Sequence, residues 1–495
     1  MAARDAAQLY RNVVREVARA VNTSISPRTQ RNKVVSANLR RLFERHGQSS
    51  EPEVFRRDVE NIVTFMRSQR EYKTLLERYN PLIDLTGEER IEATARRVGL
   101  NMPKVLKCDP TSISFDDDGR PHITSQYTLA SLRLASRHLH DLQPVAFPTE
   151  TVYGLAAIAL NAEAASRIFS IKGRPTDNPL IVHVSSQSML HSLLLPDFTI
   201  PPSYQTLINA FWPGPLTLLF PTDITKIPSI ITANHSTVAI RMPSHPVARA
   251  LIAVSNAPLA APSANSSGKP SPTRAEHVFR DLNGKVGLIL DGGPCDIGLE
   301  STVLDGLHHD GNIRILRPGG ITVEQIEEAL RLAHFGHPIP RVLVHRRDFV
   351  DDAIEQAPTT PGMKYRHYSP AIPVTLLRAT SHPPAGANSI SPSTLLASLK
   401  SSTVAKPPPK VGLLAPSESV LAKKLLQDPV IQWHRYTLGS LSEMSIIAQR
   451  LFDGLLSLEQ EGVDLILIEE VPEENEGLAI MNRVKKAASE TCWIV

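Results

Sequence analysis

The chain has 495 residues, too many for a single hydrophobic core, and this length predicts two to four domains. Its composition, 42% apolar and 21% charged residues, is typical of soluble globular proteins, and no apolar run reaches the ~18 residues of a membrane span. The net charge of +3 is uneven: residues 1–104 hold 20 Lys and Arg against 13 Asp and Glu, and the remainder holds 33 against 37. An acidic remainder, in a chain with 5% aromatic residues, argues against a basic, base-stacking surface for nucleic acid.

The three cysteines, Cys108, Cys295 and Cys492, lie far apart and form no CxxC or Cys/His cluster. This spacing argues against a disulfide framework or a structural zinc site, and it fits a reducing compartment.

Residues 1–104 show the apolar periodicity of helices. Apolar side chains recur at helical spacing at Leu9, Val13, Val17 and Val21. Breaks near Pro27, Pro52 and Pro81 divide the segment into three or four helices, which predicts a small helical bundle. The arginines on these helices are compatible with a merely solvated face.

Leu9-Tyr10-Arg11, together with residues 68–81 and 88–100, resembles the LYR-motif family, in particular its mitochondrial ATP synthase assembly factors. The resemblance implies that residues 1–104 are an adaptor module that binds mitochondrial assembly partners and performs no catalysis. The Arg-rich first twenty residues are also typical of a transit peptide, although Asp5 and Glu16 count against this interpretation. We expect a cytoplasmic location with a pool in the mitochondrial matrix.

Residues 105–118 have the composition of a polar joint. In residues 120–337, apolar strands alternate with amphipathic helices, which indicates an α/β domain. Strands are expected at 145–147, 180–184, 217–220, 237–241, 259–261, 286–290, 301–304 and 312–316, and helices at 162–171 and 326–332.

The remaining chain divides into a linker, residues 338–373, and a second α/β domain, residues 374–495. Strands at 374–377, 411–414 and 465–469 with a helix at 441–458 predict a Rossmann-like fold for this domain. Residues 381–409, rich in Ser, Pro and Ala, are expected to be a mobile insertion. No transferase or hydrolase motif occurs there, which favours a regulatory or packing role.

Polar side chains follow several of the expected strands. Thr149, Glu150 and Thr151 come after the first of them, and Lys172 and Arg174 lie on a loop where the chain must turn. Taken singly, such a Lys-x-Arg is more often a solvated turn, but ligands of open α/β sheets bind where strands end. The sequence therefore predicts an anion site, and because GxxxxGK[ST] is absent, side chains and turn amides must hold any phosphate.

Seven motifs in order between residues 147 and 320 resemble the YrdC family: FPTETVYGLA, KGRPTDNPLIVH, FWPGPLTLL, VAIRMPSHP, APSANSSGKPSPT, GLESTV and ILRPGG. Members with an additional C-terminal domain are threonylcarbamoyl-AMP synthases. The resemblance implies a twisted mixed sheet around a concave pocket, with residues 359–373 as part of a lid. It also implies condensation of L-threonine, bicarbonate and ATP, with Mg²⁺ accompanying the nucleotide, for transfer of the threonylcarbamoyl group to a tRNA adenosine by downstream machinery.

The same resemblance assigns individual residues. The catalytic quartet falls on Lys172, Arg174, Ser263 and Asn265. ATP binding is assigned to Arg174, Asn178, Thr237, Ser263, Ser271, Arg317 and the lid residue Tyr365, whose neighbours are His367 and Tyr368. Binding of the substrate threonine is assigned to Thr151, His183, Arg241, Ser301 and Ala261, the last through its backbone alone. No residue is assigned to a metal ion or as a general base.

Two alternatives stay open at this stage. The chain could be chiefly a mitochondrial assembly adaptor, or an RNA-binding module, with its enzyme domain silent. The intact quartet and the threonine residues argue against a silent domain.

Overall fold

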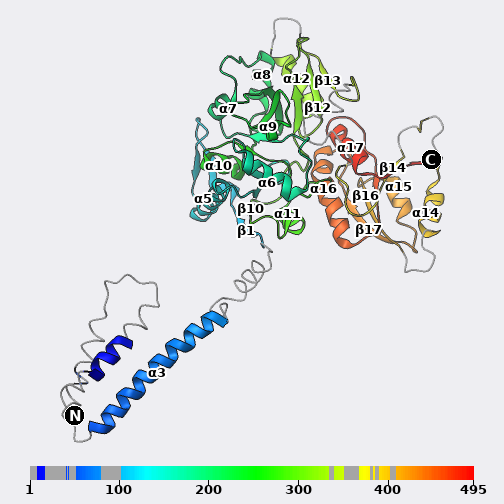
Figure 1. Cartoon of the computed structure of the whole chain (residues 1–495). Helices are drawn as coiled ribbons and strands as arrows, with labels where there is room; N and C mark the ends of the chain where they lie inside the picture. Colours follow the sequence, from blue (N-terminus) through cyan, green and yellow to red (C-terminus); the bar gives the residue numbers. More distant parts are fainter. Residues whose placement is uncertain are drawn as a thin grey trace. The chain divides into compact units, whose positions relative to one another are not determined.

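The computed structural model describes residues 8–16, 41, 43, 52–79, 102–333, 339–350, 367–379, 383–384, 389–401 and 409–495 (Figure 1). The chain divides into two compact units, Met1–Val98 and Gly99–Val495. In the described ranges, none of the helices combines the length and hydropathy that a membrane crossing requires.

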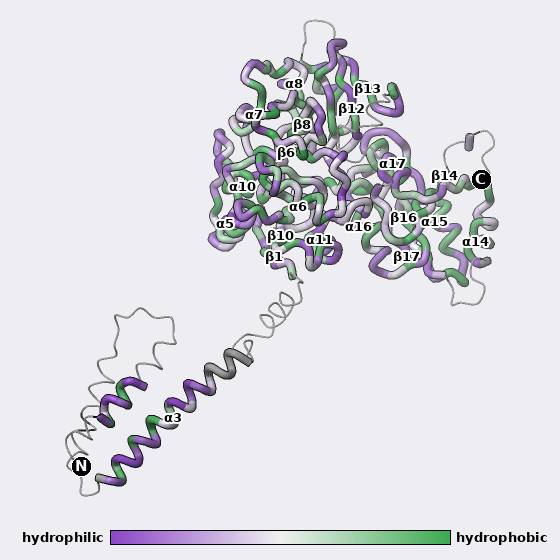
Figure 2. Tube along the Cα trace, in the orientation of Figure 1, coloured by the Kyte–Doolittle hydropathy of each residue, from purple (hydrophilic) through white to green (hydrophobic). Residues whose placement is uncertain are grey.

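The first unit contains a helix over residues 8–16 and the long helix α3, Pro52–Tyr79. Leu9 and Val13 of the shorter helix form a buried cluster with Val59 of α3. The helix predicted around Leu9 and Val13 is confirmed over residues 8–16, whereas Val17 and Val21 lie outside the described residues. Along residues 52–72 of α3, hydrophilic residues are interspersed with apolar ones (Figure 2). The other helices expected for the bundle lie outside the described residues.

An 11-stranded mixed sheet organises residues 102–350 and has the order β1-β10-β4-β5-β9-β6-β8-β7-β11-β12-β13. Its strands are β1 Lys104–Lys107, β4 Val145–Phe147, β5 Gly154–Ile158, β6 Ile181–His183, β7 Leu216–Pro221, β8 Thr237–Arg241, β9 Leu259–Ala260, β10 Leu288–Asp291, β11 Thr302–Asp305, β12 Ile313–Arg317 and β13 Val342–Val344. A 3₁₀ turn, η1 Pro110–Ser112, leads into the small antiparallel pair β2 Ile113–Phe115 and β3 Pro121–Ile123.

Helices cover both faces of this sheet because successive strand residues point to opposite faces. In β4, Val145 and Phe147 pack with the cluster that contains α5 and α10, whereas Ala146 belongs to the cluster on the other face. The first face carries α5 Gln126–His140 and α10 Pro246–Ser255. The second carries α6 Ala162–Lys172, α7 Gln187–Leu193, α8 Pro202–Phe211, α9 Ser229–Thr232, α11 Ala275–Leu282 and α12 Val323–Leu332.

Residues 374–495 form a six-stranded sheet of order β15-β19-β14-β18-β16-β17, in which every pairing is parallel. Its strands are β14 Val374–Arg378, β15 Ser389–Ile390, β16 Lys410–Ala415, β17 Gln432–Thr437, β18 Leu465–Glu469 and β19 Glu490–Ile494. Helices α14 Pro392–Ser401 and α15 Val420–Leu425 pack on one face, and α16 Met444–Glu461 and α17 Glu476–Ala487 pack on the other.

The two sheets are joined through α16 and α17, which lie on the side of the smaller sheet that faces the larger one (Figure 1). Val152 and Leu299, from the larger domain, belong to the same buried cluster as Tyr368 and Phe452. A shared apolar core of this kind restricts the motion of the two domains relative to each other.

The structure confirms the α/β class, the mixed sheet and the parallel, Rossmann-like C-terminal sheet. Three expectations were wrong. Residues 338–373, expected to be a linker, contain β13, which pairs with β12 in the large sheet. Residues 105–118 are not a joint, because β1 pairs with β10 and β2 with β3. The insertion expected at 381–409 contains β15 and α14, whose Leu395 and Leu399 are buried in the C-terminal core.

Candidate active site

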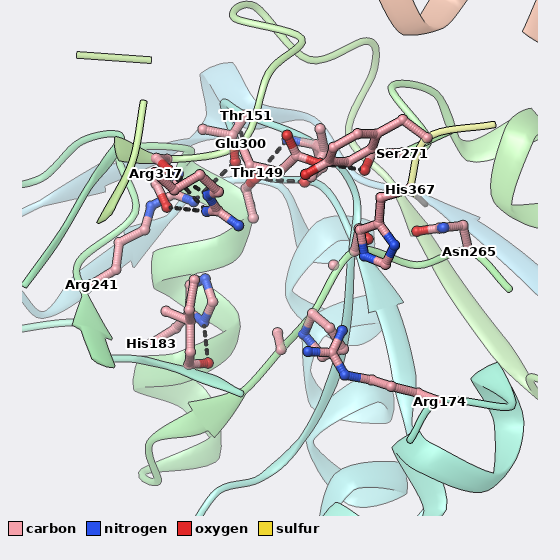
Figure 3. Close-up of a pocket in the computed structure, with 18 of the residues that line it drawn as sticks. Thr149, Thr151, Arg174, His183, Arg241, Asn265, Ser271, Glu300, Arg317 and His367 are labelled. Atoms are coloured by element: carbon pink, nitrogen blue, oxygen red, sulfur yellow. Dashed lines mark hydrogen bonds between the residues drawn. The ribbon is translucent and has the colours of Figure 1, made fainter. Parts of the chain in front are cut away.

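A pocket lies where several strands of the large sheet end (Figure 3). Thr151 follows β4, whereas His183, Arg241 and Arg317 are the last residues of β6, β8 and β12. The pocket brings together these residues predicted from sequence: Thr151, Arg174, His183, Arg241, Ala261, Ser263, Asn265, Ser271, Ser301 and Arg317. Residues up to 166 positions apart in sequence thus converge on one cavity, as the strand-end argument predicts.

The segment after β4 turns back on itself through its own hydroxyl groups. Thr149 Oγ1 donates to the Val152 carbonyl at 2.6 Å and lies 2.8 Å from Thr151 Oγ1. It also accepts hydrogen bonds from the backbone N–H groups of Thr151 and Val152 at 3.2 Å. These local bonds, typical of threonine turns, hold the Thr151 hydroxyl at the pocket wall.

Each of the three nitrogens of the Arg241 guanidinium group donates a hydrogen bond to a different residue. Its Nη1 donates to Thr151 Oγ1 at 2.9 Å, its Nε to the Gly214 carbonyl at 3.2 Å, and its Nη2 to Glu150 Oε1 at 2.5 Å. Burial opposes ionisation of Glu150, but Arg241 and backbone N–H groups outweigh it and lower the pKa of that carboxyl. Each terminal nitrogen of Arg241 carries one further N–H, so a carboxylate in the pocket can still be bound.

Two further guanidinium groups face the cavity from other elements. Arg174 donates to the carbonyls of Asn178 and Pro179, at distances between 2.9 and 3.3 Å, and Arg317 donates to the Ser301 carbonyl at 2.9 Å through Nη2. Burial, followed by the charge of Arg317, lowers the pKa of Arg174 to about 10, so it stays cationic. Two buried cations that repel each other across a pocket favour an anion between them.

His183 is neutral in this environment. Burial and then the nearby charge of Arg241 lower its pKa to about 3, and its Nδ1 lies 3.1 Å from the Ile181 carbonyl. A neutral imidazole suits hydrogen bonding to a substrate hydroxyl or amine better than binding a carboxylate.

Lys172 turns away from the cavity. Its Nζ donates to the backbone carbonyls of Ser263, at 2.5 Å, and Asn265, and it is not among the pocket-lining residues. Asn265 in turn donates through Nδ2 to the carbonyls of Ser266 and Lys269, both at 2.9 Å. The ammonium group therefore secures the loop after β9, which presents the Ser263 side chain to the pocket.

Two other predicted residues, Asn178 and Thr237, do not line the pocket. Asn178 contributes its carbonyl to Arg174, whereas its side-chain Oδ1 is buried and has no hydrogen-bond partner. Thr237 begins β8, at the opposite end of that strand from Arg241. Tyr365 lies outside the described residues.

The pocket also contains residues that sequence reasoning did not assign: Thr149, Lys269 and Glu300. Glu300 Oε1 accepts a hydrogen bond from Ser271 Oγ at 2.6 Å, and the carboxylate is buried. Its signal was available, because Glu300 lies within the GLESTV motif, two residues before β11. His367 and Tyr368, which follow Tyr365 closely in the sequence, line the pocket as well.

Comparison with known proteins agrees with this geometry. A family model described as Telomere recombination, which groups Sua5, YciO and YrdC proteins, matches residues 138–319. The model of the threonylcarbamoyl-AMP synthase C-terminal domain matches residues 321–489. The threonylcarbamoyl-AMP synthase of Schizosaccharomyces pombe is 43% identical over 416 residues, which cover 78% of this chain and 97% of the relative.

The chain belongs to the threonylcarbamoyl-AMP synthase family. The Bacillus subtilis member is 42% identical over 357 residues, covering 72% of this chain and 92% of its own. Among solved structures, Pyrococcus abyssi Sua5 complexed with L-threonine has a TM-score of 0.62 and 36% identity, covering 79% of this chain and all of that one.

The N-terminal residues 6–101 match a separate model, Complex1 LYR-like. Both resemblances drawn from the sequence are therefore confirmed. This threonylcarbamoyl-AMP synthase family member carries a LYR-like segment ahead of its two-domain enzyme portion.

Proposed function

We propose that this pocket joins L-threonine, bicarbonate and ATP into threonylcarbamoyl-AMP, releasing pyrophosphate and water. The observation that carries the proposal is the convergence of Arg174, Arg241 and Arg317 on one buried cavity lined with hydroxyl groups. Three guanidinium groups in one cavity fit anionic reactants, here the nucleotide phosphates, bicarbonate and the carboxylate of the amino acid. The identity of the synthases that share this chain's domains supports the same reaction.

For ATP, we assign the phosphates to Arg174, Arg317 and the loop of Ser263. The Ser263 hydroxyl makes no hydrogen bond to the described residues and is exposed to the cavity, so a phosphate oxygen can accept from it. The planar fork of an arginine binds phosphate oxygens in pairs. Asn178 and Thr237 would then act on the nucleotide through backbone or loop position rather than by direct contact.

For threonine, we assign the α-carboxylate to the outward N–H groups of Arg241. The substrate's hydroxyl and amine then face neutral His183 and the hydroxyls of Thr151 and Ser301. A site that hydrogen-bonds a substrate hydroxyl rejects the analogue that lacks it, on the order of 10⁴-fold, because its buried polar groups stay unpaired.

The reaction needs two bond-forming steps. The threonine amine attacks the bicarbonate carbon and water leaves, giving a carbamate; a carbamate oxygen then attacks the α-phosphorus and breaks its bond to the bridging oxygen of pyrophosphate. Negative charge grows on the phosphoryl oxygens in the second step, where Arg174 and Arg317 are fixed in place. We assign no general base, and positioning of the reactants carries the first step.

We propose that Mg²⁺ enters with the phosphates of ATP. No group of three or more His, Cys, Asp or Glu side chains that could hold a metal ion occurs among the described residues. Glu300, the carboxylate of the pocket lining, already has both oxygens engaged. When bound, the ion would neutralise phosphate charge that the arginines leave uncompensated.

The test uses the purified full chain with ATP, Mg²⁺ and bicarbonate, with threonine compared to valine. We expect pyrophosphate release with threonine, little with valine, and a product of the mass of threonylcarbamoyl-AMP. A folded sample that binds ATP and releases pyrophosphate with neither amino acid would refute the assignment.

We further propose that the product serves tRNA threonylcarbamoyl transfer and that the LYR-like unit binds mitochondrial assembly partners. The family match over residues 6–101 supports the second point, as do the exposed Ile62, Phe65 and Tyr72 of α3. A cytoplasmic protein with a matrix pool would follow. Fractionation of cells expressing the full chain, compared with a variant lacking the first unit, residues 1–98, tests it: unchanged distribution and an unchanged set of bound proteins would exclude this role.

A further inference from the structure

Arg483, on α17 of the C-terminal domain, reaches into the wall of the pocket. It is the largest fully buried side chain in the described part of the chain, with 0% of its surface exposed. Its Nε donates to Glu300 Oε2 at 3.1 Å, and its Nη1 donates to the carbonyl of Pro318. One side chain thus ties together two segments of the catalytic domain that precede β11 and follow β12.

Glu300 links this contact to the residues that we assign to ATP. Its other oxygen, Oε1, accepts from Ser271 Oγ at 2.6 Å, so the carboxylate bridges Arg483 and Ser271. Burial opposes its ionisation, but Arg483 and then Arg317 lower the pKa of this carboxyl. Pro318, the second partner of Arg483, directly follows Arg317.

The backbone at this point leaves no room for adjustment. A Cβ on Gly319 would lie 2.3 Å from the Glu300 carbonyl oxygen and 2.4 Å from the Ser301 carbonyl carbon. The two segments are therefore pressed together where Arg483 crosses them, and displacement of one moves the other.

We propose that Arg483 is a positioning residue for ATP: by pairing with Glu300, it keeps that carboxylate from pairing with Arg317. The inference rests on the proposed function. Without Arg483, Glu300 would be an unpaired buried carboxylate with Arg317 as the next cation, and their pairing would remove the positive charge that a phosphate needs. In this way the C-terminal domain completes the nucleotide site, through the charge of Arg483.

This role makes a selective prediction. Loss of Arg483 should weaken ATP binding, whereas the binding of threonine, whose carboxylate we assign to Arg241, should be affected much less. If Arg483 only held the two domains together, its loss would lower the stability of the protein and weaken the binding of both substrates alike.

The experiment compares Arg483→Met, Arg483→Lys and the double variant Arg483→Met/Glu300→Gln in the full chain. We expect Arg483→Met to raise the KM for ATP about tenfold or more, with a smaller change in the KM for threonine. Arg483→Lys should recover part of the loss because it keeps the charge. The double variant should bind ATP better than Arg483→Met, because the competing carboxylate is gone.

The matched control is Arg274→Met. Arg274 also crosses the domain boundary, pairing with Asp453 of α16 at 2.7 Å, but it does not line the pocket. We expect it to leave the KM for ATP within about twofold of wild type, as for a half-exposed ion pair.

Direct ATP binding, measured by calorimetry, separates this inference from the reaction itself. A wild-type protein that binds ATP without releasing pyrophosphate would refute the proposed function, and the comparison of ATP affinities would still decide the role of Arg483. Equal losses for both substrates, or a double variant no better than Arg483→Met, would overturn the inference. If Arg483→Met does not fold, Arg483→Lys and the double variant decide the question.

Discussion

Lys172→Met distinguishes a lysine that holds a loop from one that grips ATP. Methionine keeps most of the length of the buried stem but removes the ammonium group that donates to the Ser263 and Asn265 carbonyls. If these bonds define its role, the variant should lose stability even when no nucleotide is present.

The magnitude follows from the two carbonyl contacts. Hydrogen bonds from a charged donor contribute about 1.5–3 kcal/mol each. Burial of the ammonium offsets part of this, as shown by burial lowering the pKa of Lys172 well below its usual value. We therefore expect the free energy of unfolding of Lys172→Met to be lower by about 2–4 kcal/mol. For a domain of this size, this corresponds to a fall in Tm of about 5–10 °C.

The assay is thermal unfolding of the full chain without ATP, paired with the KM for ATP. Lys285→Met is the control, since this exposed lysine approaches the same loop from outside, 3.5 Å from Ser266 Oγ. We expect its Tm to stay near that of wild type. An unchanged Tm for Lys172→Met, together with a strongly raised KM for ATP, would refute the loop-holding role.

Three more changes test the pocket. Arg241→Lys loses the fork that reaches Thr151 and Glu150, so the KM for threonine should rise on the order of 100-fold in the pyrophosphate assay. Glu150→Gln should flatten the dependence of stability on pH below about 4.5. The pKa of Glu150 is lower in the folded than in the unfolded protein, so its carboxylate stabilises the fold above the unfolded-state pKa. This stabilisation is lost as the pH falls through the folded-state pKa. Gly319→Ala should reduce stability by roughly 3 kcal/mol, seen as a lower Tm, because its Cβ would overlap the Glu300 carbonyl.

Each of these has its own control and its own contradicting result. Arg241→Lys with unchanged threonine KM would remove Arg241 from the carboxylate site. For the pH series, Glu163→Gln changes an exposed carboxylate paired with Arg167, and an equal flattening there would mean that Glu150 is not responsible. Gly287→Ala is the control for Gly319→Ala because its Cβ meets nothing within 4 Å, and similar stability of the two variants would contradict the packing argument.

Much of the fold was readable because buried strands leave uninterrupted apolar runs. The strands at 145–147, 237–241 and 465–469 were placed correctly from such runs alone. Strand β1 was missed because it is an edge strand of only four residues, with lysines at both ends and Val105 exposed. Short edge strands carry little apolar signal, so their pairing is decided by partners distant in sequence.

The sequence identified many of the residues that line the site, but it did not show how their side chains are arranged. Motif positions and strand ends identified Arg174, Arg241 and Arg317 as pocket residues. No pattern in the sequence tells which way a side chain points, and Lys172 turns toward backbone carbonyls instead of the cavity. Nor does any local pattern connect Glu300 with Arg483, since 183 residues separate them.

The contribution of α17 to the pocket wall has a consequence for the newly made protein. The ribosome synthesises the chain from its amino end, and domains generally fold in the order in which they are made. Arg483 comes later in the sequence than every residue that lines the pocket, so a nascent or prematurely terminated chain without α17 presents Glu300 and the arginines without this partner. The nucleotide pocket is therefore complete only after α17 has been made, and fragments ending before residue 476 should bind ATP more weakly than the full chain.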